Sequence, residues 1–159
     1  MVDFCTKIEA EKYLQALVGL HLSYVRKAYD FDMFEFCFEQ KHSVFLQTAP
    51  NNTASREKLT LILHAICELK VIWPNKRTNV YNAETPLKQF YTNINQLLSL
   101  SVKRIALSDK NDLWIDLGVC WIVFITFESN EESWRFFTTE KKHPHLVASD
   151  LWLQTVYST

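Results

Sequence analysis

Residues 119–127 constrain the fold more than any other stretch, because every position except Thr126 is apolar. Side chains alternate between the two faces of a β-strand, so Trp121 and Ile122 each begin an apolar face. A strand that is apolar on both faces either lies centrally, with both faces covered, or faces a partner subunit. We therefore expect a layered domain built around this strand, or a homo-oligomer in which a second copy covers it.

The segments on either side of this run predict further short elements. Residues 112–117 alternate apolar and polar side chains, which indicates a half-buried strand, and Gly118 then permits a turn. Ser129 is a good N-cap residue and Glu132 follows three positions later, so this pair predicts a capping box and a short helix. Residues 145–148 then return as a strand.

Two amphipathic helices are predicted elsewhere. Thr6 and Glu9 form a capping box that opens a helix over residues 7–18. Thr85 is a capping residue, and Pro86 suits the first helical position, so a second helix begins here and ends near residue 100. The other expected elements are strands over residues 22–29, 33–39, 44–47, 78–82 and 102–107.

Two segments are ambiguous. Residues 58–73 fit strict alternation but also contain a helical set of apolar residues; we favour a strand with a bend near Glu68, because β-branched residues are frequent. Residues 150–157 suit a strand or a short helix equally. We find no internal repeat and no linker. Together the elements predict a single α+β domain over residues 1–159, a mainly antiparallel sheet packed against two amphipathic helices plus one short helix.

Composition excludes several classes of function. A net charge of −1 supplies no field that would attract nucleic acid or anionic lipid. With only 2 Gly, the chain lacks a glycine-rich phosphate loop. The 4 Cys are scattered without a CxxC motif, which indicates a reducing cytoplasm rather than a disulfide framework. We find neither a signal peptide nor an apolar run of the ~20 residues that a membrane helix needs. We expect a cytoplasmic protein without a cofactor.

One pair of histidines suggests a metal site. His143 and His145 could point the same way on a strand, but no third ligand is marked, and Lys141 and Lys142 would repel a cation. We therefore expect no metal. His64 lies in an apolar strand pattern, which is typical of a core histidine with its hydrogen bonds satisfied.

A cysteine–histidine pair would need one of three cysteines beside His64. Cys37, Cys67 and Cys120 all lie in apolar patterns, where a thiol is buried and inert. We therefore expect no catalytic residue and a protein that is not an enzyme.

Tryptophan, arginine and acidic residues offer a binding surface instead, because aromatic and arginine side chains are typical of binding hot spots. The structural alternative is core packing for Trp134, helix capping for Glu131 and Glu132, and an ion pair for Arg135, with Glu131 as its partner. The candidate binding residues are Trp114, Asp116, Glu131, Glu132, Trp134 and Arg135.

Three segments carry a family resemblance: LVGLHLSYVRKAYDFDMFEFCF, LTLILHAICELKVI, and LWIDLGVCWIVFITFESNEESWRFF followed by HPHLV. Together they resemble a loosely defined family of small uncharacterised bacterial α+β proteins of the immunity-protein type. The family pattern has an acidic E-x-W-R motif, matched here by Glu132, Trp134 and Arg135. It also carries Trp-Arg after the middle Cys, where this chain has Leu69 and Lys70. The resemblance implies a role in toxin neutralisation by direct binding.

Three functional hypotheses follow. The first is a non-enzymatic protein-binding module, an immunity-type protein whose partner is a toxin. The alternative is a small-molecule-binding protein or enzyme with a pocket between the sheet and a helix, lined by His64 and aromatic strands. The third is a structural homo-oligomer that covers the outer side of residues 119–127.

Overall fold

A computed structural model describes residues 2–28, 33–40, 60–139 and 143–157. The strands in this part of the chain are β1 (Val2–Phe4), β2 (His21–Ala28), β3 (Met33–Glu39), β4 (Thr60–Ala65), β5 (Glu68–Ile72), β6 (Thr78–Tyr81), β7 (Arg104–Leu107), β8 (Leu113–Asp116), β9 (Trp121–Ile125), β10 (Trp134–Thr138), β11 (His145–Ala148) and β12 (Leu153–Val156). The helices are α1 (Lys7–Leu14) and α2 (Leu87–Ile94), continued by the 3-10 turns η1 (Gln15–Leu17) and η3 (Asn95–Leu97).

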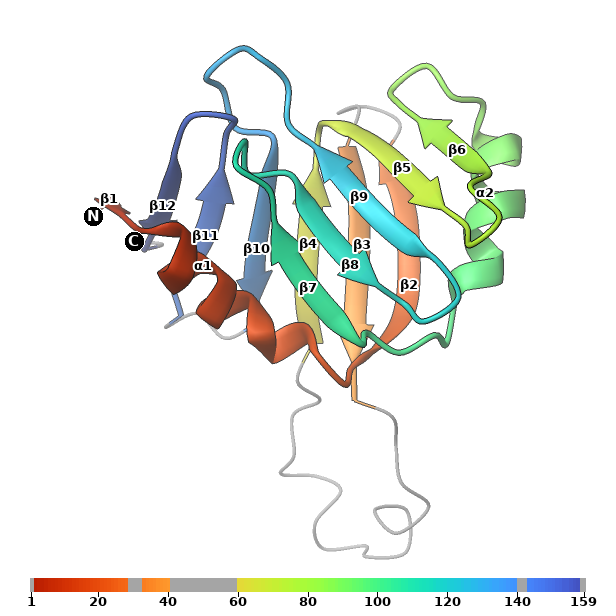
Figure 1. Cartoon of the computed structure of the whole chain (residues 1–159), viewed down its shortest axis with the longest axis horizontal. Helices are drawn as coiled ribbons and strands as arrows, with labels where there is room; N and C mark the ends of the chain where they lie inside the picture. The colour runs from red at the N-terminus through yellow and green to blue at the C-terminus, as the bar shows by residue number, and fades with distance from the viewer. Residues whose placement is uncertain (1, 29–32, 41–59, 140–142, 158–159) are drawn as a thin grey trace, which may run out of the picture.

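The strands form two antiparallel sheets that pack face to face (Figure 1). The large sheet has seven strands in the order β1-β12-β11-β10-β4-β3-β2, and the small sheet has five in the order β6-β5-β9-β8-β7. The expected α+β class is therefore wrong, and the fold is mainly β. The two α-helices have only 8 residues each, too few to cover a sheet, so a second sheet covers the first. No described helix is long enough to cross a membrane.

The core lies between the two sheets. Phe36 on β3 meets Phe124 on β9 edge to face, with ring centroids 5.1 Å apart. The helices close the sides of the layer. Tyr13 on α1 packs against Phe136 of the large sheet, and Phe90 on α2 packs against Phe34 of the large sheet and Tyr81 of the small one.

The chain crosses from one sheet to the other once in its first half and once in its second half. Strands β2, β3 and β4 lie in the large sheet, after which β5 and β6 join the small sheet. Strands β7, β8 and β9 then lie in the small sheet, after which β10, β11 and β12 join the large one. Three antiparallel seams hold the halves together: β4 with β10, β5 with β9, and β1 with β12. Both sheets are therefore composites of the two halves.

The contacts where the halves meet repeat with an offset of 80 positions. The amide of Gly19 donates to the carbonyl of Val102 at 2.9 Å, and the amide of Ser99 donates to the carbonyl of Leu22 at 2.7 Å. Ser99 lies 80 positions after Gly19, and Val102 lies 80 positions after Leu22. Gly19 and Ser99 also share a positive φ, of 91° and 73°. The chain thus contains a structural repeat, contrary to the sequence expectation.

Unlike side chains fill equivalent positions of this repeat, which hides it in the sequence. The amide of Leu107 donates to Oε1 of Glu11 at 3.4 Å. The amide of Lys27, 80 positions earlier, donates to the hydroxyl of Tyr91 at 3.0 Å. A carboxylate and a phenol thus accept the same backbone hydrogen bond.

The short helix predicted after Ser129 is wrong, because this segment is a turn that leads into β10. Side chains here alternate: Trp134 is buried and Arg135 points outward. Glu132 binds Arg135 instead of capping a helix, while the hydroxyl of Ser129 accepts from the amide of Glu131. Pairing of β10 with both β4 and β11 outweighs the local helix signal.

Several local predictions are confirmed. Both hydrogen bonds of the capping box at Thr6 and Glu9 are present. The segment predicted as a bent strand forms β4 and β5, which cross between the sheets at Ile66 and Cys67. The ambiguous C-terminal segment is strand β12. Helix α2 begins one residue later than predicted, with Pro86 at the cap position. The strand expected at 44–47 falls outside the described residues.

Candidate protein-binding surface

The outer face of the small sheet carries a cluster of tryptophans. Register places Trp121 of β9 opposite Asp116 of β8, and Val123 opposite Trp114. The Trp114 and Trp121 rings meet edge to face, with centroids 5.9 Å apart. Both indoles are half-buried, whereas Val123 between them is only 1% exposed. This chain therefore covers the centre of the apolar β9 face with its own side chains.

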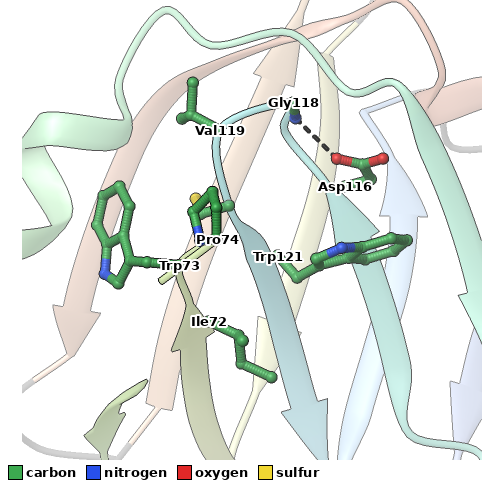
Figure 2. A pocket seen from close by; sticks show the side chains of 8 residues that line it. Ile72, Trp73, Pro74, Asp116, Gly118, Val119 and Trp121 are labelled. Carbon is green, nitrogen blue, oxygen red and sulfur yellow. Dashed lines mark hydrogen bonds between the residues drawn. The ribbon is translucent and has the colours of Figure 1, made fainter. Parts of the chain in front are cut away.

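A cleft of about 180 Å³ opens at one end of this face (Figure 2). Two turns build it. Gly118, with φ of 87°, allows the tight turn between β8 and β9, and Trp73 and Pro74 begin the turn between β5 and β6. Figure 2 shows the indoles of Trp73 and Trp121 on either side of Pro74, with Val119 at the β8–β9 turn. The cleft is lined by Ile72, Trp73, Pro74, Asp116, Gly118, Val119, Cys120 and Trp121.

A second, more open hollow of about 260 Å³ is also lined by Trp121. Its lining includes Ala106, Ser108 and Trp114. Trp121 thus lines two hollows on one face of the small sheet. A ligand that filled both would contact this indole in each of them.

Asp116 is the acid of the cleft, and it is fully engaged by the protein. Its Oδ1 accepts from the amide of Gly118 at 2.8 Å, and its Oδ2 accepts from Nε of Arg104 at 3.1 Å. Its side chain is only 14% exposed. Asp116 therefore holds the turn and Arg104 in place, and it is poorly suited to act as a general base.

An arginine covers each tryptophan of the cleft. The guanidinium of Arg104 lies 5.1 Å from the ring centroid of Trp121, and that of Arg77 lies 5.3 Å from the centroid of Trp73. The indole nitrogen of Trp73 also donates to Oδ1 of Asn79 at 2.9 Å. Each exposed cation–π contact contributes about 0.5–1 kcal/mol. These contacts hold the cleft walls in position, which lowers the entropic cost of binding.

The outer face of the large sheet carries a different group, a row of charges. Register places Arg26, Glu35, His64 and Arg135 opposite one another on β2, β3, β4 and β10. Oε2 of Glu35 lies 2.8 Å from Nε2 of His64 and 3.5 Å from Nη2 of Arg26. The prediction that His64 lies in the core is therefore wrong: its side chain is 25% exposed and paired with a carboxylate.

Arg135 joins this row to the next strand. It donates two hydrogen bonds to Glu132, of 2.8 and 2.9 Å, and its Nη1 lies 3.1 Å from Nδ1 of His145. Hydrogen bonding to Glu132 raises the pKa of Arg135. Burial, followed by the charge of Arg135, lowers the pKa of His145, whose ring stacks on Phe137 at 4.7 Å. His145 is therefore neutral at pH 7 and accepts from Arg135.

The described thiols are protonated at neutral pH. Burial raises the pKa of Cys37 to about 11, of Cys67 to about 12 and of Cys120 to about 11. A protonated thiol is a poor nucleophile. Among the described residues, no three His, Cys, Asp or Glu side chains come together in a way that could hold a metal ion.

The structure separates the six residues that the sequence proposed for binding. Trp114 and Asp116 share the outer face of the small sheet. Glu132 and Arg135 pair on the large sheet, and the Glu131 backbone lies in the preceding turn.

Trp134 lies in the core rather than on either outer face. It is 0% exposed, and its indole nitrogen donates to the carbonyl of Asn111 at 2.9 Å, so its assignment as a binding residue is wrong. Sequence reasoning missed Trp73, Arg77 and Arg104. Only the pairing of β5 with β9 brings Trp73 near Trp121, and no local pattern reports that pairing.

No family model, curated protein or solved structure matches this chain.

Proposed function

We propose that this protein is a non-enzymatic protein-binding module that uses the outer face of the small sheet. The observation behind the proposal is the cleft lined by Trp73, Pro74 and Trp121, with Arg77 over the ring of Trp73 and Arg104 over that of Trp121. Tryptophan and arginine are the side chains most enriched in binding hot spots. Here they are held in place and partly exposed, which is the state in which they contribute most to affinity.

The proposal extends to the mode of action: neutralisation of a toxin by direct binding, in a bacterial cytoplasm. The sequence resemblance to immunity-type proteins motivates this part. An inhibitor that occludes its target needs a rigid scaffold and a complementary patch, without a reactive group. The two-sheet scaffold supplies rigidity, and the tryptophan face supplies the patch.

The state of the polar groups favours binding over catalysis. Asp116, the acid of the cleft, is engaged by Gly118 and Arg104. The alternative of a pocket between sheet and helix relied on His64, but this side chain lies on the outer face of the large sheet and pairs with Glu35. The homo-oligomer hypothesis relied on an uncovered β9, yet Val123 at its centre is already buried within one chain.

Affinity purification with matched variants tests the proposal. The tagged protein, Trp121→Ala and the control Tyr24→Ala, which removes a 51% exposed aromatic from the large sheet, would each be used to capture partners from the source organism. We expect one near-stoichiometric protein with the wild type and the control, and loss of it with Trp121→Ala at an unchanged circular dichroism spectrum. Expressed alone, the partner should be toxic, and only variants that bind it should protect. A partner retained equally by Trp121→Ala would refute the assigned surface.

A further inference from the structure

We infer that the partner presents an acidic segment whose central apolar side chain enters the cleft lined by Ile72, Pro74, Val119 and Trp121. This inference rests on the proposed function and adds the chemistry of the partner. Its two parts are an apolar cleft that admits a side chain and a basic rim that attracts carboxylates on either side of it.

The rim of the cleft carries four basic residues from two separate segments. Lys76 and Arg77 lie in the turn between β5 and β6, Arg104 begins β7, and Lys103 immediately precedes it. All four are exposed. Lys103 lies across the β8–β9 turn, with its Cε 3.6 Å from the position that a Cβ on Gly118 would occupy. Basic groups therefore flank the cleft on both sides.

The protein leaves most of this charge uncompensated. Arg104 pairs with Asp116, but among the residues that the structure describes, Lys76, Arg77 and Lys103 form no ion pair. The whole chain carries a net charge of −1, so this basic rim is a local departure from a balanced surface. Such a field attracts acidic partners and increases their rate of association.

The interior of the cleft suits a side chain rather than a free metabolite. Ile72, Pro74 and Val119 contribute apolar surface, and the carboxylate of Asp116 is already neutralised. The volume of about 180 Å³ lies below the ~300–1,000 Å³ typical of small-molecule pockets. One large apolar side chain is the appropriate occupant.

The same rim could attract nucleic acid, whose bases stack on aromatic side chains. The arginines argue against this reading. Arg104 covers the ring of Trp121 and Arg77 covers that of Trp73, so each indole has a cation over a ring face that a base would need. An acidic peptide instead keeps both cation–π contacts and adds its carboxylates around them.

Titration of the full-length protein with three synthetic peptides tests the inference. The first has a central Phe flanked on both sides by Asp and Glu; the second replaces Phe with Ser; the third replaces the acids with Lys. Tryptophan fluorescence and amide chemical shifts report binding. We expect the first peptide to bind about tenfold or more tightly than either control, with shifts at the cleft and an affinity that falls as salt rises.

Charge reversal separates this inference from the proposed function. Lys76→Glu combined with Lys103→Glu changes the rim without altering either tryptophan. Lys88→Glu, on the exposed side of α2, is the control for a charge reversal away from the rim. We expect the double variant to lose the acidic peptide and to weaken the captured partner about tenfold or more, and the control to retain both. A partner that needs Trp121 but tolerates the double variant overturns the inference and leaves the proposed function intact. Equal binding of the three peptides, or tighter binding of a single-stranded oligonucleotide, also overturns it.

Discussion

Replacement of Trp134 by Phe should destabilise the protein without affecting its binding of a partner. The indole is 0% exposed, and its nitrogen donates to the carbonyl of Asn111. Phe leaves that carbonyl without its donor, which costs about 1–3 kcal/mol, and a residual cavity adds roughly 1 kcal/mol more. We expect a loss of about 2–4 kcal/mol in the free energy of unfolding, or a fall in Tm of roughly 10 °C for a domain of this size.

The same chemical change at Trp121 provides the matched control. Trp121 is half-buried on the outer face of the small sheet, so Trp121→Phe should cost less than about 1 kcal/mol. Urea denaturation followed by circular dichroism measures both, and partner capture is tested at a temperature where both variants are folded. We expect Trp134→Phe to lose stability but keep partner binding, and Trp121→Phe to lose partner binding but keep stability. Equal stability of the two variants, or loss of binding by folded Trp134→Phe, would refute the core assignment of Trp134.

Three further predictions concern the chain ends, the repeat and pH. A circular permutant that joins the paired ends of β1 and β12 and opens the chain within residues 82–86 should unfold cooperatively with a wild-type circular dichroism spectrum, because the joined ends are neighbours in the sheet. A molten chain would contradict the pairing of β1 with β12. Gly19→Ala should cost about 1 kcal/mol through its positive φ, whereas Ser99→Gly, at the equivalent position, should not destabilise; thermal melts compare them. The pKa of His145 is lower in the folded state, so the unfolded state binds a proton there more readily, and the free energy of unfolding should fall as pH drops through about 6.5. The dependence of that free energy on pH should be weaker in His145→Gln. An unchanged pH dependence, measured by urea titrations, would contradict the contact with Arg135.

Caps and turns could be predicted from the sequence wherever residues close together along the chain determine the structure. Thr6 and Glu9 cap α1 through a reciprocal pair that spans three residues, and Gly118 takes the positive φ that its turn requires. The same kind of pattern failed at Ser129 and Glu132. There the spacing of a capping box coincides with that of a turn, and pairing of the next residues with β4 and β11 decides the outcome.

Only part of the candidate site could be predicted from the sequence. Trp114 and Asp116 belong to the strand that the alternation of 112–117 predicts, and their hairpin partner Trp121 follows from a tight turn at Gly118. Trp73 comes from the other half of the chain. Only the β5–β9 seam brings it to the cleft, and no apolar pattern specifies which strands will be neighbours.

The seams between β4 and β10 and between β5 and β9 also set the order of events during synthesis. Translation delivers β4 and β5 well before β10 and β9, the strands that pair with them. Until the second half leaves the ribosome, each of these apolar strands therefore presents an open hydrogen-bonding edge, and such edges recruit other chains. Stop codons or proteolytic cuts between β6 and β9 would leave fragments with both edges exposed. Those fragments should aggregate rather than persist as half-folded domains.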